Sequence, residues 1–352
     1  MNVTWKTELC PVDTRKPEAA CIERAASWLK RGELVAFPTE TVYGLGADGG
    51  NAQACAKIYE AKGRPSDNPL ILHVADVDAL RPLVREISPQ AETLMSELWP
   101  GPMTLIFRRS DRVPDIVTAG GDTVAIRLPE HPVARALIRA AGCPVAAPSA
   151  NRSGRPSPTN ALDVRADMEG RIPMILDGGS SQIGIESTVI DVTVEPAMIL
   201  RPGYYTKEYL EAWLPGIRLD RSIVRDGVVP RSPGQKYRHY APQAELTVYV
   251  GSPEAVNQAI QKALHQAKAA GKRTGAMLFD EDPDPADCDV VLRLGSRSEL
   301  SQMGHFLFSN LRAFDRAGVD VIFGVGVSAL EGYGISIMNR LKKSAGGRVV
   351  VL

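Results

Sequence analysis

The chain has 352 residues, of which 44% are apolar, and it carries 41 basic and 41 acidic side chains. This neutral balance gives no global signal for nucleic acid or for an acidic partner, so any anion site must come from local placement of charge. The length predicts two domains, with one large domain as the alternative, and a substantial core.

The cysteines and the apolar runs indicate the compartment. Five cysteines are scattered along the chain without a C-x-x-C pair, which predicts neither a disulfide framework nor a structural zinc site. No apolar run is long enough to span a membrane, and the N-terminus has no apolar signal core. We therefore expect a cytoplasmic protein.

The first two thirds of the chain alternate irregularly between helix and strand patterns. Amphipathic or capped segments predict helices at 17–31, 51–61, 76–85, 89–98, 132–141 and 160–168. Short apolar or alternating runs predict strands at 34–37, 69–74, 103–107, 123–127, 145–147, 174–176, 187–192 and 197–200. The irregular order favours an α/β fold with a twisted mixed sheet over a strictly doubly wound one.

The pattern changes after residue 213. Residues 214–243 hold several prolines among basic and aromatic side chains, which is typical of an interdomain linker. From 244 to 352 strands and helices alternate again, with a helix predicted at 298–317 and Ser298 as its N-cap. This alternation predicts a smaller, Rossmann-like domain with a parallel sheet. The expected organisation is a domain at 1–213, a linker at 214–243 and a second domain at 244–352.

The segment from Lys62 to Asn68 places polar side chains at alternate positions: Lys62, Arg64, Ser66 and Asn68. In an extended segment alternate side chains share one face, so two cations, a hydroxyl and a carboxamide would point in one direction. Such a face suits the phosphates and sugar of a nucleotide. The alternative is a solvated basic loop, because such loops are common on protein surfaces.

Two other patterns carry less weight. Gly44-x-Gly46-x-x-Gly49 matches the dinucleotide fingerprint by letter, but Lys62 and Arg64 stand where an acidic residue should follow. We interpret it as a chance match. No G-x-x-x-x-G-K-[ST] loop is present. His73 lies in an apolar strand, where a lone histidine is more often a core residue than a catalyst.

Further polar groups follow or open predicted strands. Ser149-Ala-Asn151 follows a buried strand, and loops at strand ends are where α/β sheets bind ligands; a capped turn is the alternative. Glu186-Ser-Thr188 opens a β-branched strand. Within the linker, Ser232-Pro-Gly-Gln-Lys-Tyr-Arg-His-Tyr-Ala-Pro242 combines aromatics with cations. Such a segment suits stacking and phosphate contact over a nucleotide, or binding of single-stranded RNA.

These motifs occur together in the order found in one family. Pro38-Thr-Glu-Thr-Val-Tyr-Gly-Leu-Gly46, Lys62-x-Arg64-x-Ser66-x-Asn68, Ser149-Ala-Asn151, Glu186-Ser-Thr188 and Arg201-Pro-Gly203 resemble the threonylcarbamoyl-AMP synthases. The linker and the C-terminal α/β domain resemble the longer, two-domain form. The resemblance implies a nucleotidyltransferase that joins L-threonine, bicarbonate and ATP into L-threonylcarbamoyladenylate and releases pyrophosphate. It also implies a concave cavity in the catalytic domain, with the linker as its lid.

The resemblance implies roles for individual residues. Lys62 and Arg64 are expected to supply the catalytic positive charge that lets two anions approach each other. ATP contacts are expected from Arg64, Ser66, Asn68, Thr123, Ser149, Asn151, Ser157, Arg201, His239 and Tyr240. The threonine pocket is expected to be lined by Thr41, His73, Arg127, Ala147 and Ser187. Arg127 is a natural partner for the substrate's carboxylate.

The expected cofactor is Mg²⁺ carried in with ATP, since no cluster of carboxylates marks a dedicated metal site. The product would feed N6-threonylcarbamoyladenosine formation at position 37 of tRNAs that read codons beginning with A, through downstream transferase proteins and with possible tRNA contact. The alternative function is a tRNA- or dsRNA-binding regulatory protein without catalysis. Neutral net charge argues against it, because sequence-independent RNA affinity depends on excess cations.

Overall fold

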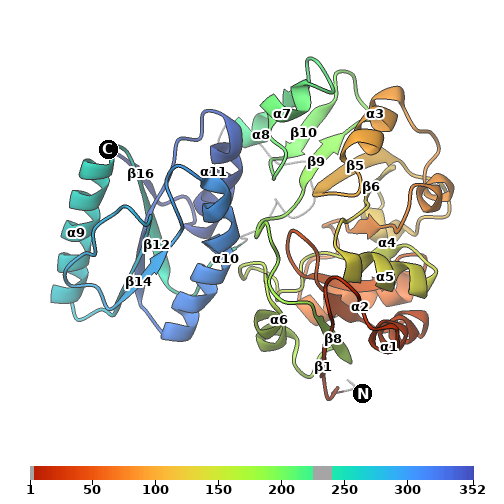
Figure 1. The fold of residues 1–352 in the computed structure, drawn as a ribbon, viewed down its shortest axis with the longest axis horizontal. Helices are drawn as coiled ribbons and strands as arrows, with labels where there is room; N and C mark the ends of the chain where they lie inside the picture. Colours follow the sequence, from red (N-terminus) through yellow and green to blue (C-terminus); the bar gives the residue numbers. More distant parts are fainter. Residues whose placement is uncertain (1–3, 225–239) are drawn as a thin grey trace. The chain divides into compact units, whose positions relative to one another are not determined.

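The structure is a computed structural model that describes residues 4–224 and 240–352. Its chain divides into two compact units (Figure 1). The described residues of unit 1 are 4–153, 157–182 and 186–224, and those of unit 2 are 154–156, 183–185 and 240–352. Within these residues, no helix combines the length and apolar character needed to cross a bilayer.

Unit 1 is built on a mixed sheet of eleven strands, counted over the described residues, in the order β1-β8-β2-β3-β7-β4-β6-β5-β9-β10-β11. Parallel and antiparallel pairs alternate irregularly across it, which confirms the mixed sheet predicted from the sequence. The strands are β1 (Glu8–Pro11), β2 (Val35–Phe37), β3 (Gly44–Asp48), β4 (Ile71–His73), β5 (Met103–Arg108), β6 (Thr123–Arg127), β7 (Val145–Ala146), β8 (Met174–Asp177), β9 (Thr188–Asp191), β10 (Met198–Arg201) and β11 (Arg218–Leu219).

Helices connect and cover these strands. They are α1 (Ala19–Lys30), α2 (Ala52–Lys62), the 3-10 helix η1 (Asp78–Leu83), α3 (Pro89–Leu98), α4 (Asp115–Thr118), α5 (Pro132–Ala141), α6 (Ala161–Met168), α7 (Lys207–Glu211) and α8 (Arg221–Val224). Asn51 caps the start of α2, because its side chain accepts the backbone N–H groups of Gln53 and Ala54, as its residue type favours. Gly63 ends the helix at φ 62°, a left-handed conformation that glycine adopts without a Cβ penalty.

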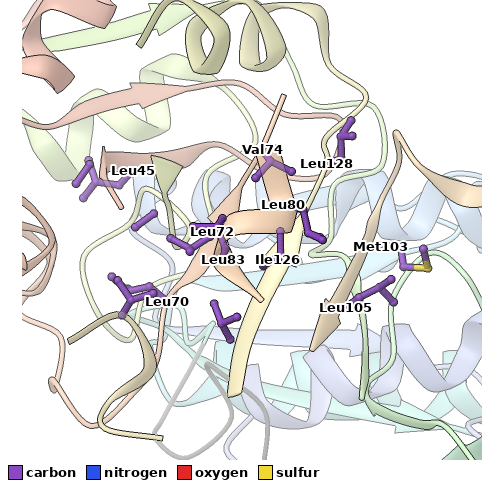
Figure 2. Close-up of a cluster of buried hydrophobic side chains, with 14 of the residues drawn as sticks. Leu45, Leu70, Leu72, Val74, Leu80, Leu83, Met103, Leu105, Ile126 and Leu128 are labelled. Atoms are coloured by element: carbon purple, nitrogen blue, oxygen red, sulfur yellow. The ribbon is translucent and has the colours of Figure 1, made fainter. Parts of the chain in front are cut away.

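The central strands place the largest core on one face of the sheet, and on the other face a polar row beside a small apolar cluster. Leu72, Ile126 and Leu105 are register partners across β4, β6 and β5, and all three are buried in one apolar cluster (Figure 2). Because successive side chains of a strand point to opposite faces, the neighbouring residues His73 and Arg127 lie on the other face. The alternation of each strand therefore positions one polar row opposite the core.

Close packing explains the glycine pattern at 44–49. A Cβ on Gly46 would lie 2.9 Å from side-chain atoms of Phe37 and Val145, and one on Gly49 would lie 2.6 Å from Leu72. These approaches are shorter than a carbon–carbon contact allows. The glycines let β3 and the following turn pack against neighbouring strands. Close packing therefore explains why glycines stand at these positions without requiring a dinucleotide site.

Several sequence expectations are corrected. Lys62 is the last residue of α2, so Lys62 to Asn68 is a helix end followed by a turn, not one extended row. The segment at 76–85 forms only η1, a 3-10 helix that contains Pro82. Strands β1, β3, β11 and β16 were not predicted, because they are short or glycine-rich. Cys10 and Cys21 form a disulfide that joins β1 to α1, a pairing that the undetected β1 concealed.

Unit 2 contains a sheet of five strands, all parallel, in the order β14-β13-β15-β12-β16. Figure 1 shows α9 on one side of this sheet and α10 and α11 on the other. The elements are β12 (Glu245–Val250), α9 (Pro253–Ala269), β13 (Thr274–Leu278), β14 (Val290–Arg293), α10 (Leu300–Ala317), β15 (Val321–Val325), α11 (Gly332–Ser344) and β16 (Val349–Val351). The predicted parallel-sheet domain is confirmed, although α10 begins after Glu299 and not at a Ser298 cap.

The first residues of the expected linker, 214–224, are part of the fold of unit 1. Ile217 is buried in the core of unit 1, and β11 pairs with β10 in parallel. Residues 214–224 therefore belong to unit 1. A strand of two residues carries too little pattern to be recognised in the sequence. The rest of the linker, residues 225–239, lies outside the described residues.

Candidate functional site

A row of polar side chains crosses the sheet of unit 1 on the face opposite its largest core. His73 of β4 and Thr104 of β5 are both register partners of Arg127 in β6. Thr104 is in turn paired with Val189 of β9, whose partner in β10 is Arg201. Since register partners point to the same face, these strands bring His73, Arg127, Thr104 and Arg201 into one line.

Arg127 is the centre of a buried network. Its guanidinium donates to the Glu40 carboxylate (Nη2–Oε1, 2.6 Å) and to the Thr41 hydroxyl (Nη1–Oγ1, 2.8 Å). The three residues are at most 4% exposed. Among the described residues, Arg127 Nε, Glu40 Oε2 and His73 Nδ1 have no hydrogen-bond partner although each atom is buried. Buried polar groups are normally satisfied, so these three atoms are candidate contacts for a polar ligand.

The electrostatics of this network keep His73 neutral. Burial, followed by the nearby positive charge of Arg127, lowers the pKa of His73 to about 3. Both causes act against the imidazolium form. At neutral pH the ring can donate or accept a hydrogen bond, but it adds no charge to the site.

A second network joins β5, β9 and β10. The hydroxyls of Thr104 and Ser187 lie 2.8 Å apart, and Arg201 donates to both the carbonyl oxygen and the hydroxyl of Ser187 at 3.0 and 3.1 Å. All three side chains are buried. This arrangement fixes the orientation of Ser187 just before β9 and places a guanidinium beside it.

A third group surrounds the loop that follows β7. The ammonium group of Lys62 donates to the carbonyl oxygens of Ser149 and Asn151, at 2.5 and 2.6 Å. The Ser149 hydroxyl donates to the Asn151 side chain at 2.6 Å. Lys62 is 3% exposed, so its charge is buried against this loop. The same loop is held to the segment after Thr41, because the Ala150 N–H donates to the Tyr43 carbonyl at 2.8 Å.

The other residues expected to contact ATP do not belong to these three networks. Arg64 donates to the carbonyl oxygens of Asn68 and Pro69 within its own turn, and Ser66 is exposed. Asn68 is buried. Thr123 shares a face with Arg127 but begins β6, which puts the two about 13 Å apart at the rise of a strand.

The remaining expected residues fall in three places. Ser157 is fully buried and donates to the Glu186 carboxylate at 2.6 Å. Ala147 is buried beside β4, where its N–H donates to the Ile71 carbonyl at 2.9 Å. Tyr240 belongs to unit 2 and packs its ring against Phe308, with 5.0 Å between the ring centroids. His239 lies outside the described residues.

Sequence reasoning missed two members of the site. Thr104 stands inside an apolar strand, and the only signal was a hydroxyl in the middle of Met103–Phe107. Glu40 lay within a quoted motif but received no role, although a carboxylate flanked by apolar and hydroxyl residues is unusual for a buried segment. Both residues were assigned to the site only from their hydrogen bonds in the structure, Glu40 with Arg127 and Thr104 with Ser187.

The fold and the site define a two-domain α/β protein in which a buried arginine and several hydroxyls form a polar site on the sheet of the larger domain. Family models give the finer assignment. One described as telomere recombination matches residues 27–203, and one described as the C-terminal domain of threonylcarbamoyl-AMP synthase matches residues 205–346.

Curated relatives match nearly the whole chain. The threonylcarbamoyl-AMP synthase of Bacillus subtilis is 47% identical, with 96% of each chain covered, and that of Pyrococcus abyssi is 45% identical, with 94% of this chain and 95% of the relative covered. The solved structure of P. abyssi Sua5 complexed with L-threonine has a TM-score of 0.93 at 44% identity, covering 98% of this chain and all of that one.

The chain belongs to the threonylcarbamoyl-AMP synthase family, in its two-domain form. This membership confirms the family resemblance and the nucleotidyltransferase class predicted from the sequence. It favours synthesis of threonylcarbamoyl-AMP over the alternative of an RNA-binding regulator without catalysis.

Proposed function

We propose that the chain joins L-threonine, bicarbonate and ATP into L-threonylcarbamoyladenylate and releases pyrophosphate. The observation that carries the proposal is the buried network of Arg127, Glu40 and Thr41, which leaves polar atoms without partners beside the neutral His73. A small zwitterionic amino acid would satisfy such atoms, and family membership identifies it as L-threonine.

The amino acid is proposed to bind along the polar row. Arg127 would contact its carboxylate through N–H groups that Glu40 and Thr41 leave available. Thr41 and Ser187 offer hydroxyls, and His73 offers a neutral ring nitrogen, for the substrate's hydroxyl and amine. The buried Ala147 would bound the site on the side of β4.

ATP is proposed to bind toward the loop of residues 149–151 and the turn after α2. Arg64 would contact the phosphates, and Arg201 would add positive charge from the far end of the polar row. The buried ammonium of Lys62 holds the 149–151 loop in place, so we assign it positioning of that loop together with its electrostatic contribution. The remaining proposed contacts within unit 1 are Ser66, Asn68, Thr123, Ser149, Asn151 and Ser157, and ATP contact by His239 and Tyr240 stays a prediction from the sequence.

The chemistry requires two anions to meet. Threonine's amine and bicarbonate would give a carbamate and water. A carbamate oxygen then attacks the α-phosphorus of ATP, and the bond to pyrophosphate breaks as pyrophosphate leaves. Positive charge from Arg64, Arg201 and Lys62 lowers the repulsion between the carbamate and the phosphates. The neutral state of His73 means that it orients groups by hydrogen bonding and does not supply charge.

Mg²⁺ is proposed to enter with ATP and to neutralise phosphate charge. The described residues bring no three His, Cys, Asp or Glu side chains together as a metal site. Phosphate oxygens and water would then be its principal ligands, as is common for this ion. The chain's own contribution is to bind and orient the phosphates.

The wider role is proposed from the same family. The adenylate would supply threonylcarbamoyl transferases that modify adenosine 37 of tRNAs reading codons that begin with A, in the cytoplasm, with or without direct tRNA contact by this chain. The proposed lid function of the linker stays a prediction, since most of the linker lies outside the described residues.

Pyrophosphate release from ATP tests the proposal. It should require L-threonine and bicarbonate together, and the adenylate should appear in equal amount by mass spectrometry. Release that ignores threonine, or none at all, would overturn the enzyme assignment. A regulator without catalysis would instead show only salt-sensitive RNA binding.

A further inference from the structure

We propose that Glu40 determines specificity in the amino-acid site: its free carboxylate oxygen, Oε2, accepts an N–H of the substrate's α-amino group while Oε1 holds Arg127. The inference rests on the proposed function for the identity of the substrate. It assigns a role to a residue outside the set expected to contact threonine.

The first argument is the unequal use of the two carboxylate oxygens. Oε1 accepts from Arg127 at 2.6 Å, whereas Oε2 is buried and has no partner among the described residues. Glu40 as a whole is 3% exposed, so bulk water does not solvate the carboxylate well. An unpaired buried carboxylate oxygen is unfavourable, and a bound N–H donor would remove that penalty.

The second argument is the rigidity of the backbone on either side of Glu40. The Thr39 hydroxyl donates to the Val42 carbonyl at 2.6 Å and lies 2.8 Å from the Thr41 hydroxyl. It also accepts the backbone N–H of Val42 at 3.3 Å. Thr39 and Thr41 are buried as well. The turn therefore holds Glu40 in place before any ligand arrives, which reduces the entropy lost on binding.

The third argument is charge. Arg127 and Glu40 together are neutral, and burial and the charge of Arg127 leave His73 neutral as well. A free amino acid is a zwitterion, so it enters such a site without introducing net charge. Arg127 retains N–H groups for the carboxylate, and Glu40 Oε2 offers an acceptor for the ammonium group. The same oxygen still accepts an N–H after the amine has lost its extra proton.

A purely structural role for Glu40 is the competing explanation. In that case Glu40 would only orient Arg127, and its replacement would weaken binding of any ligand that uses the carboxylate contact. The two explanations differ in one measurable respect: only direct contact makes Glu40 sensitive to whether the ligand carries an amino group.

The test is a ligand and mutation cycle measured by calorimetry on the full chain. Wild type and Glu40→Gln are titrated with L-threonine and with 3-hydroxybutanoate of the same configuration at C3, which has a hydrogen in place of the amine. Glutamine keeps an oxygen that can accept from Arg127 but removes the negative charge. Glu33→Gln is the matched control, because Glu33 pairs with Lys57 at 2.7 Å in another part of unit 1.

We expect Glu40→Gln to weaken L-threonine binding by about tenfold to a hundredfold, as for a lost charge-assisted hydrogen bond, and to change binding of the deaminated analogue much less. Equal losses for both ligands would show that Glu40 acts only through Arg127. An unchanged affinity for threonine would remove Glu40 from the site altogether.

Two controls separate this inference from the proposed function. If wild type binds no threonine, the proposed function fails independently of Glu40. If Glu40→Gln does not fold, which far-ultraviolet circular dichroism would show, Glu40→Asp is titrated in its place. The aspartate keeps the charge but shortens the reach, so we expect it to lose affinity for threonine and to retain the preference for the aminated ligand.

Discussion

Ser157 and Glu186 lie 29 positions apart in the chain, yet the Ser157 hydroxyl donates to the Glu186 carboxylate at 2.6 Å in a buried environment. The bond ties the loop that follows residues 149–151 to the segment that leads into β9. Two residues that are distant in the sequence are therefore held together within unit 1.

Replacing Ser157 with alanine removes this donor. We expect the free energy of unfolding to fall by about 1–3 kcal/mol, because a buried carboxylate loses a hydrogen bond. We also expect the Michaelis constant for ATP to rise. Denaturant titration and steady-state kinetics provide the measurements, with Ser27→Ala as the control, since its hydroxyl bonds to the Arg24 carbonyl at an exposed position. Equal effects of the two substitutions would contradict the role given to Ser157.

Replacing Arg64 with alanine should abolish or strongly reduce adenylate formation while the protein stays folded. The residue is only partly buried, and it donates to the carbonyl oxygens of Asn68 and Pro69, so we expect its loss to act mainly on the turn after α2. Arg85→Ala is the control, because Arg85 forms an exposed ion pair with Asp111. Pyrophosphate release by Arg64→Ala at the wild-type rate would exclude Arg64 from the reaction.

Replacing Lys62 with methionine should affect stability as well as activity. Its buried ammonium group satisfies two carbonyl oxygens of the 149–151 loop, and methionine supplies no donor. We expect a loss of about 2–4 kcal/mol in the free energy of unfolding, together with weaker ATP binding. Lys207→Met, at a surface pair with Glu211, should change the unfolding free energy by less than about 0.5 kcal/mol. A stable Lys62→Met protein that lacks only activity would mean that Lys62 acts on the phosphates alone.

His73 makes stability depend on pH in the acidic range. Burial, with a contribution from Arg127, lowers the pKa of His73 to about 3 in the folded protein, whereas an unfolded chain has a histidine pKa near 6.5. Between these values the unfolded state binds the extra proton, so stability falls as pH drops from about 6.5 toward 3. The slope contributed by this residue approaches about 1.4 kcal/mol per pH unit.

The variant His73→Gln should remove that contribution. Urea titrations at several pH values would show a shallower decline of the unfolding free energy than in wild type. His131, whose pKa burial also lowers, contributes a slope of the same sign, so His131→Gln serves to separate the two. An unchanged pH dependence in His73→Gln would show that His73 is not the group responsible.

The sequence predicted local features better than their assembly. The helix α2, its Asn51 cap and the alternating strand β6 follow from residue pattern, because caps and alternation depend on near neighbours. Arg127 was predicted to be a carboxylate partner from its residue type and from the family resemblance. Its bonds to Glu40 and Thr41 were not predictable from pattern, because they join residues 87 and 86 positions away.

The Lys62 segment shows a different limit. Polar residues at alternate positions predicted one extended face. Helix α2 instead continues through Lys62, and the Lys62 ammonium group points toward the 149–151 loop. Local periodicity cannot distinguish these outcomes when a helix ends inside the motif. The end of α2 therefore decides that Lys62 contacts the 149–151 loop, whereas Arg64 lies in the turn that follows the helix.

The alternation along β4, β6 and β5 has a consequence for how this protein can diverge. Leu72 and His73 are adjacent, yet one supports the core and the other belongs to the polar row. A single-codon insertion or deletion within β4 would exchange their faces, burying the imidazole among leucines and moving a leucine into the row. Length changes in these strands should thus be far less tolerated than substitutions, and natural variation in chain length is expected in the connecting loops.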